Sequence, residues 1–118
     1  MLIEEFEKLA DKAVKGLPDI FKNKMRNVVV IVAGSPDKAQ TRKFGSGLLG
    51  LYEGVPLLER GTEYSGVMPD KITLFQKNIE AQCSGAEEVE REVRAVVMHE
   101  VAHHFGITDE ELRKKGLY

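Results

Sequence analysis

Residues 96–112, VVMHEVAHHFGITDEEL, contain all three histidines of this chain and decide how its last third folds. Apolar residues cover nearly every side of Val93–Phe105, the second part of a predicted helix, and a helix of that kind is buried. Gly106 follows where a left-handed residue commonly ends a helix. Thr108, with Glu111 three residues later, matches a capping box that begins another helix. The segment therefore predicts a buried helix, a sharp turn and a short closing helix.

The first two histidines share one face of that helix. His99 and His103 are four residues apart, so their directions differ by about 40°, and both imidazoles can reach one metal ion at about 2.0–2.1 Å. Glu100 lies about 60° around the helix from His103, beside such a metal but not directed at it. This HExxH pattern is typical of zinc hydrolases in which the glutamate is the general base. We predict Zn²⁺ as cofactor, His99 and His103 as ligands, and Glu100 as catalytic base.

The chemistry requires both residue types. Neutral imidazoles leave the metal its positive charge, which lowers the pKa of bound water to about 7. A carboxylate beside that water can take its proton during attack on a carbonyl and then return it to the leaving amine. The alternative is a pair of core histidines bonded to backbone carbonyls, or one histidine paired with Glu100, since buried polar groups need partners.

A hydrolytic zinc site usually has three protein ligands and one open position. The candidates after His103 are His104, Asp109, Glu110 and Glu111. His104 points about 100° away from His103, which favours a partly exposed neighbour of the site. Gly106 allows a sharp turn that can bring Asp109 back toward the metal. We predict Asp109 as the third ligand, with Glu110 and Glu111 as alternatives, although Asp109 also suits a helix N-terminus.

The rest of the chain alternates helix and strand signals. Apolar spacing predicts a helix over Ile3–Lys15, and Ser84 with Glu87 matches a capping box opening the helix that runs to about Phe105. The closing helix is expected to end near Lys115. The β-branched run NVVVIVAG, residues 27–34, predicts a central strand. The other expected segments are strands at Leu48–Tyr52 and Lys71–Gln76, an extended Val55–Leu58 and a loop over 61–70.

Length and composition fit one domain over residues 1–118, with 42% hydrophobic and 31% charged residues. The net charge is −2 and the cations are scattered, which argues against nucleic-acid binding. No apolar run approaches the roughly 18 residues of a membrane span. The N-terminus lacks the pattern of a secretory signal, and Cys83 is the single cysteine, so we expect a cytoplasmic protein in which Cys83 is structural.

The order of these elements predicts an α+β domain: a small mixed sheet of about three to four strands, packed against an N-terminal helix, an active-site helix and a short C-terminal helix. HEVAHHFGITDEEL, preceded by GLLGLYEGVPLLERG and DKITLFQKNIE, resembles the small bacterial zincin-like metallopeptidases built around HExxHxxGxxD. The similarity covers roughly residues 40 to 112. It implies a minimal zincin fold, with zinc held by His99, His103 and Asp109 and with Glu100 as base.

The spacing is that of a metzincin with aspartate as third ligand. No Met-turn can follow the motif, since Met68 and Met98 precede it. Three function classes are open: a peptidase, a metal hydrolase acting on another substrate, and a metal-stabilised binding module. An intact Glu100 favours an enzyme, because a structural zinc site has four closed ligands and needs no base.

The expected partner is a peptide or protein substrate, with no nucleic acid and no membrane. In zincins a substrate commonly pairs with an edge strand beside the active helix. Lys71–Gln76 precedes that helix and is the predicted substrate strand, with Leu48–Tyr52 as the alternative. Tyr52, Tyr64 and Tyr118 could donate to an oxyanion, but packing is the role we expect for them.

Overall fold

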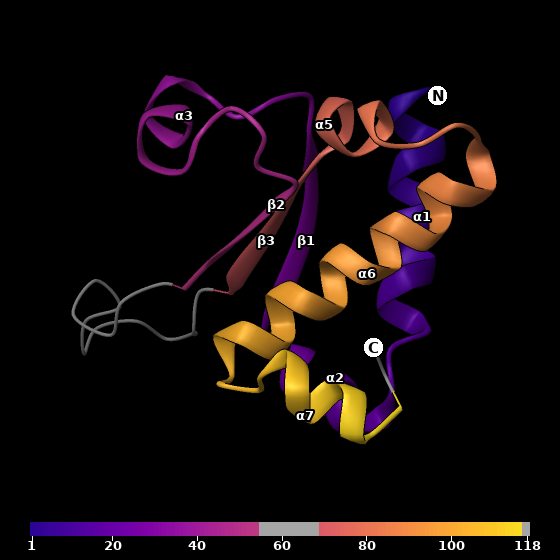
Figure 1. Cartoon of the computed structure of the whole chain (residues 1–118), viewed down its shortest axis with the longest axis vertical. Coiled ribbons are helices and arrows are strands. Elements are labelled where there is room, and N and C mark those ends of the chain that lie inside the picture. Colours follow the sequence, from indigo (N-terminus) through magenta and orange to yellow (C-terminus); the bar gives the residue numbers. More distant parts are fainter. Residues whose placement is uncertain (55–68, 117–118) are drawn as a thin grey trace.

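The structure, a computed structural model, describes residues 1–54 and 69–116 (Figure 1). In chain order the elements are α1 (Ile3–Lys15), α2 (Asp19–Lys22), the 3₁₀ turn η1 (Asn23–Met25), β1 (Val28–Ala33), α3 (Lys38–Phe44), β2 (Gly50–Glu53), β3 (Asp70–Phe75), α5 (Gln76–Ala81), α6 (Ala86–His104) and α7 (Asp109–Lys114). The extended segment predicted at Val55–Leu58 lies outside the described residues, as do most of the predicted 61–70 loop, Tyr64, Met68 and Tyr118.

The described strands form one mixed sheet in the order β1-β3-β2. β1 runs parallel to β3, with Val28 opposite Asp70, whereas β2 runs antiparallel to β3, with Gly50 opposite Leu74. Parallel strands need a long crossover and antiparallel strands do not. The direction of each strand therefore depends on the segment that connects it to the strand before it. With its helices, this sheet confirms the predicted α+β fold class.

Two predictions about the sheet are wrong. The apolar run of β1 suggested a central strand, yet β1 is an edge of the described sheet, and Val29 and Ile31 on its outer face are 43% and 42% exposed. The segment predicted at Lys71–Gln76 was expected at an edge, yet β3 pairs with a strand on both sides. Hydrophobicity reports burial of side chains, but a strand's position depends on which backbones pair, so composition did not separate these two strands.

Helices α1 and α6 pack against each other and against the sheet (Figure 1). α1 contacts β1, and α6 crosses β2 and β3. Their apolar stripes and the inner face of β3 make one hydrophobic core, whose fully buried side chains include Phe6, Ile72, Leu74, Val93, Val97, Val101 and Leu112. The core therefore holds α6 against β2 and β3. None of the described helices has the length and apolar character needed to cross a membrane.

The start of α6 differs from the prediction. Ser84 with Glu87 was expected to form the capping box, but the N-cap is Gly85, without a side-chain cap. The Glu88 carboxylate instead accepts hydrogen bonds from the Ser84 N–H and hydroxyl, both at 3.0 Å. A carboxylate one residue further along can reach back equally well. The sequence pattern therefore identified the start of α6 but not the glutamate that binds Ser84.

Short helices α2, α3 and α5 were not predicted. α3 starts with a reciprocal capping box, in which Gln40 N–H donates to Asp37 Oδ1 at 2.7 Å and Asp37 N–H donates to Gln40 Oε1 at 2.9 Å. Figure 1 shows α3 at the upper left, beside the sheet and away from α1.

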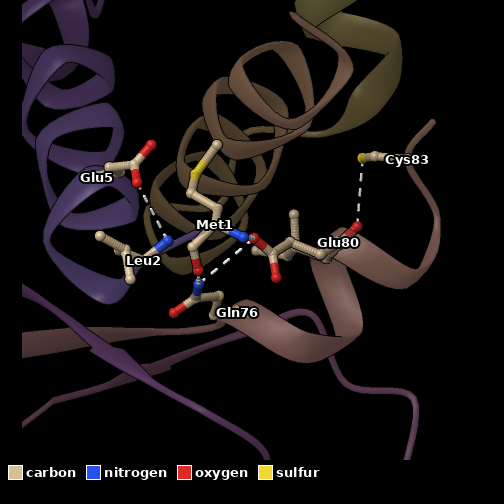
Figure 2. A network of polar contacts seen from close by, with 7 residues as sticks. Met1, Leu2, Glu5, Gln76, Glu80 and Cys83 are labelled. Atoms are coloured by element: carbon tan, nitrogen blue, oxygen red, sulfur yellow. Dashed lines mark hydrogen bonds and ion pairs between the residues drawn. The ribbon is translucent and has the colours of Figure 1, made fainter. Parts of the chain in front are cut away.

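The helix α5 follows β3 without a spacer and holds the start of the chain (Figure 2). Gln76 Nε2 donates to the Met1 carbonyl at 2.9 Å, and the Met1 amine lies 3.4 Å from Glu80 Oε1. At the other end of α5 the Cys83 thiol donates to the Ile79 carbonyl at 3.3 Å. Burial, reinforced by neighbouring carboxylates, raises the pKa of Cys83, which disfavours the reactive thiolate.

Candidate metal centre

The turn between α6 and α7 is a Schellman motif. Gly106 adopts φ +76°, its N–H donates to the His103 carbonyl at 3.1 Å, and the Ile107 N–H donates to the Ala102 carbonyl at 2.7 Å. Ile107 packs against the core, which fixes the direction in which the chain leaves α6. The Thr108 hydroxyl then accepts from the Glu111 N–H at 3.2 Å and caps α7. The predicted sharp turn and closing helix are both present.

This turn brings Asp109 back onto the histidine face of α6. Asp109 Oδ1 lies 3.1 Å from His103 Nε2, and the two side chains are 43% and 56% exposed. Two ligand atoms on one tetrahedral zinc, each about 2.0–2.1 Å from the metal, are about 3.3 Å apart. The His103–Asp109 separation is therefore close to the one that a shared zinc requires.

The two motif histidines lie one above the other on α6. The rings of His99 and His103 are nearly parallel, at 8°, with centroids 5.7 Å apart. Within residues 1–54 and 69–116, no three His, Cys, Asp or Glu side chains converge closely enough to form a metal-binding group. The donor chemistry nevertheless suits zinc, because two imidazoles and one carboxylate are its preferred ligands and leave one position open.

Two of the other candidates for a third ligand, Glu110 and His104, have different partners. The Glu110 carboxylate lies 3.8 Å from Lys114 Nζ, and its side chain is 78% exposed. His104 stacks on the ring of Tyr52, with centroids 3.7 Å apart and planes 14° apart, and meets Phe105 edge-on. His104 therefore joins α6 to β2, in agreement with the expectation that it neighbours the site.

The Glu100 carboxylate reaches the edge of β2. It is partly buried, and the backbone N–H of Tyr52 favours its charged form. Burial raises the pKa of Glu100 above its ordinary value, while His103 and the Tyr52 N–H oppose that rise. The carboxylate thus lies between the histidine face of α6 and the backbone of β2, where burial makes it a better proton acceptor than an exposed glutamate.

At Gly50 and Tyr52, the backbone N–H and carbonyl groups of β2 point away from β3. Phe75 N–H donates to the Leu49 carbonyl at 3.0 Å, which makes these two residues a hydrogen-bonded pair. Such pairs alternate in an antiparallel ladder, so Gly50 and Tyr52 direct their backbone groups away from β3. The influence of the Tyr52 N–H on the pKa of Glu100 agrees with this alternation.

Three residues that support β2 were not predicted as part of the site. The Tyr52 hydroxyl donates to Asp70 Oδ2 at 3.0 Å, so Tyr52 has the packing role that was expected and a polar partner besides. Asn78 of α5 donates to the carbonyls of Ser46 and Leu48, both at 2.8 Å, and holds the segment that enters β2. These contacts join residues 18 to 32 positions apart, so no local sequence pattern indicates them.

Comparison with known proteins supplies the family. Residues 25–117 match the zincin-like metallopeptidase family, a region that includes the whole sheet, α6 and α7. A search of curated proteins found no match. The match covers well over half of the chain, and the mixed sheet beside a helix bearing HExxH agrees with it. This chain therefore belongs to the zincin-like metallopeptidase family.

Proposed function

We propose that this protein is a zinc-dependent peptidase in which His99, His103 and Asp109 hold the metal and Glu100 is the general base. The observation that carries the proposal is the 3.1 Å contact between His103 Nε2 and Asp109 Oδ1, made by the turn that follows an HExxH helix. A zinc ion bound there would supply an acidified water and polarise the scissile carbonyl.

Glu100 would take a proton from the attacking water and pass it to the leaving nitrogen. Its position supports this role, since the partly buried carboxylate lies next to the histidine face without being one of the proposed ligands. Burial keeps the proton affinity of Glu100 above that of an exposed glutamate. The Tyr52 N–H favours the charged form of this carboxylate at the edge of β2.

We further propose that a peptide substrate lies along the outer edge of β2, replacing the strand first predicted. β3 is paired on both sides, whereas the described part of the sheet ends at β2. An added peptide strand could pair with the outward backbone groups of Gly50 and with the Tyr52 carbonyl. Its main chain would then run past Glu100, which contacts the same edge.

We also propose that residues 1–118 act as a single domain. Phe6 in α1 and Leu112 in α7 are both fully buried in the same hydrophobic core, although they stand at opposite ends of the chain. A core shared by both ends favours one folding unit over two.

The first experiment is to measure the metal content of purified protein by mass spectrometry, for the wild type and for His99→Ala and Asp109→Ala. We expect one zinc per chain in the wild type and reduced zinc in both variants. Glu110→Ala is the matched control, because it removes a neighbouring carboxylate that pairs with Lys114 instead. Wild-type protein that cannot take up added zinc would refute the proposed metal site.

The second experiment replaces Glu100 with glutamine and measures hydrolysis of a peptide library. Glutamine has nearly the same size but cannot accept the proton, so Glu100→Gln should keep zinc and lose hydrolysis. General-base catalysis typically contributes about 10²–10⁴-fold, and the rate should fall within that range. Unchanged hydrolysis in Glu100→Gln would exclude the mechanism.

A further inference from the structure

Gly50 lies where β2 packs closely on the helix that carries HExxH. It is buried, and a Cβ added to it would lie 2.7 Å from Val96 Cγ1, 3.4 Å from the Thr73 carbonyl oxygen and 3.5 Å from Glu100 Cγ. Contacting carbon atoms are normally about 3.5–4.0 Å apart. A methyl group at this position therefore does not fit unless β2 and α6 separate by about 1 Å.

Val96 cannot easily move away from such a methyl group. Its side chain is 6% exposed and belongs to the core, and a β-branched side chain on a helix has one strongly preferred rotamer. On the other side Gly50 is held by β3, since it faces Leu74 in the ladder. The strain of a side chain at position 50 would thus act on the spacing between β2 and α6.

That spacing decides whether the Tyr52 amide reaches the Glu100 carboxylate. Glu100 lies four residues after Val96, which is about one helical turn, and its Cγ would lie 3.5 Å from a Cβ at Gly50, so β2 and α6 meet beside this carboxylate. Tyr52 is two residues from Gly50 and shares its outward backbone direction.

We propose that Gly50 is a positioning residue for Glu100: its missing side chain lets β2 approach α6 closely enough for the Tyr52 amide to hold the carboxylate. The inference rests on the proposed function for the catalytic role of Glu100. The contact between the Tyr52 amide and Glu100 can be tested without measuring activity. The inference assigns a role to the glycine-rich segment before the active helix, which the zinc site alone does not explain.

The test compares Gly50→Ala with Gly47→Ala. Gly47 lies in the same segment, but a Cβ there meets nothing within 4 Å, and neither glycine has a positive φ. A displacement of about 1 Å at a reacting group can cost about 100-fold in rate, so kcat of Gly50→Ala should fall by about that factor while zinc content stays at the wild-type level. Gly47→Ala should match the wild type.

A readout independent of turnover is hydrogen exchange at the Tyr52 amide, followed by NMR. Glu100→Ala defines the exchange rate of this amide without its acceptor, and we expect about tenfold faster exchange there. Gly50→Ala should exchange at a similar rate. Exchange as slow as in the wild type, with kcat within twofold of it, would overturn the inference.

The double variant Gly50→Ala/Val96→Ala provides the rescue, because it removes the Cγ1 atom that the new methyl group meets. Restored Tyr52 protection relative to Gly50→Ala supports the inference, and no restoration overturns it. If Gly50→Ala alone does not fold, the double variant carries the test: a protected Tyr52 amide supports the inference and a fast-exchanging one overturns it. A wild type that protects the Tyr52 amide but hydrolyses no peptide would refute the proposed function while leaving the positioning contact established.

Discussion

Replacing Gly106 with alanine should weaken zinc binding without removing any proposed ligand. Gly106 adopts φ +76°, and a Cβ there would meet nothing within 4 Å, so the cost of alanine is conformational and not steric. An L-residue in the left-handed region costs about 1–2 kcal/mol. The apoprotein can release that strain by opening the turn after α6, which moves Asp109 away from His103. Zinc binding must then restore the strained turn.

The strain energy of the turn sets the upper limit on the loss of zinc affinity. An energy of about 1–2 kcal/mol corresponds to a factor of about 5–30 in an equilibrium constant. We therefore expect Gly106→Ala to bind zinc up to about 30-fold more weakly than the wild type, measured by competition with a chromophoric chelator. Urea unfolding of the apoprotein should show a loss of stability no greater than the same strain energy.

The matched control is Gly116→Ala. Gly116 also has a positive φ, +71°, follows a helix, and has nothing within 4 Å of its added Cβ, but it lies beyond α7. This variant should lose a comparable stability and keep its zinc affinity. Equal zinc affinities in Gly106→Ala and the wild type, with the expected loss of stability, would show that the turn does not control a metal ligand.

Three further predictions concern the same region. Asp109→Ala should lower zinc affinity by more than about 100-fold, since loss of partners outside the ligand set already costs about 10–100-fold; equal losses in Asp109→Ala and Glu110→Ala, by chelator competition, would refute the assignment. Tyr52→Phe removes the bond to Asp70 and should cost about 1 kcal/mol in urea unfolding near pH 8. Burial raises the pKa of Tyr52, so the folded state keeps a proton that the unfolded state releases near pH 10, and wild-type stability should fall as the pH rises above 10. Tyr52→Phe should lack that alkaline loss, and parallel declines of both proteins would contradict it. Leu112→Ala removes a fully buried side chain of α7 and should cost about 2–5 kcal/mol in thermal or urea unfolding; a loss below about 1 kcal/mol would show that α7 is not anchored by the core.

The helices were the most predictable part of the fold. The bounds of α1, Ile3–Lys15, coincide with the prediction, because a strongly amphipathic segment ended by Gly16 and Pro18 leaves little choice. α6 ends at His104, within one residue of the predicted Phe105. The missed α3 carries its signal in the sequence, since Asp37 and Gln40 have the capping-box spacing. α5 follows β3 directly, so no turn residues mark the change from the alternating pattern of a strand to the pattern of a helix.

The candidate site divides in the same way. The spacing of His99, Glu100 and His103 is a property of one helix, and the return of Asp109 depends on one glycine and one cap a few residues away. Each of these follows from local backbone geometry, which short stretches of sequence encode. The sequence therefore contained the proposed ligand set and base before any tertiary contact was known.

Tertiary structure alone decided which strand lies beside that helix. The order β1-β3-β2 and the packing of β2 on α6 arise from pairings between residues about twenty or more positions apart, as in Gly50 with Leu74. β1 is the more apolar of the two strands and yet lies at the edge of the described sheet, so the hydrophobic pattern did not tell edge from centre. The close approach of Gly50 to Val96 and Glu100 follows from that choice. Helix periodicity is a local property of the chain, whereas strand position is set by backbone hydrogen bonds between distant segments, and only the folded chain determines those.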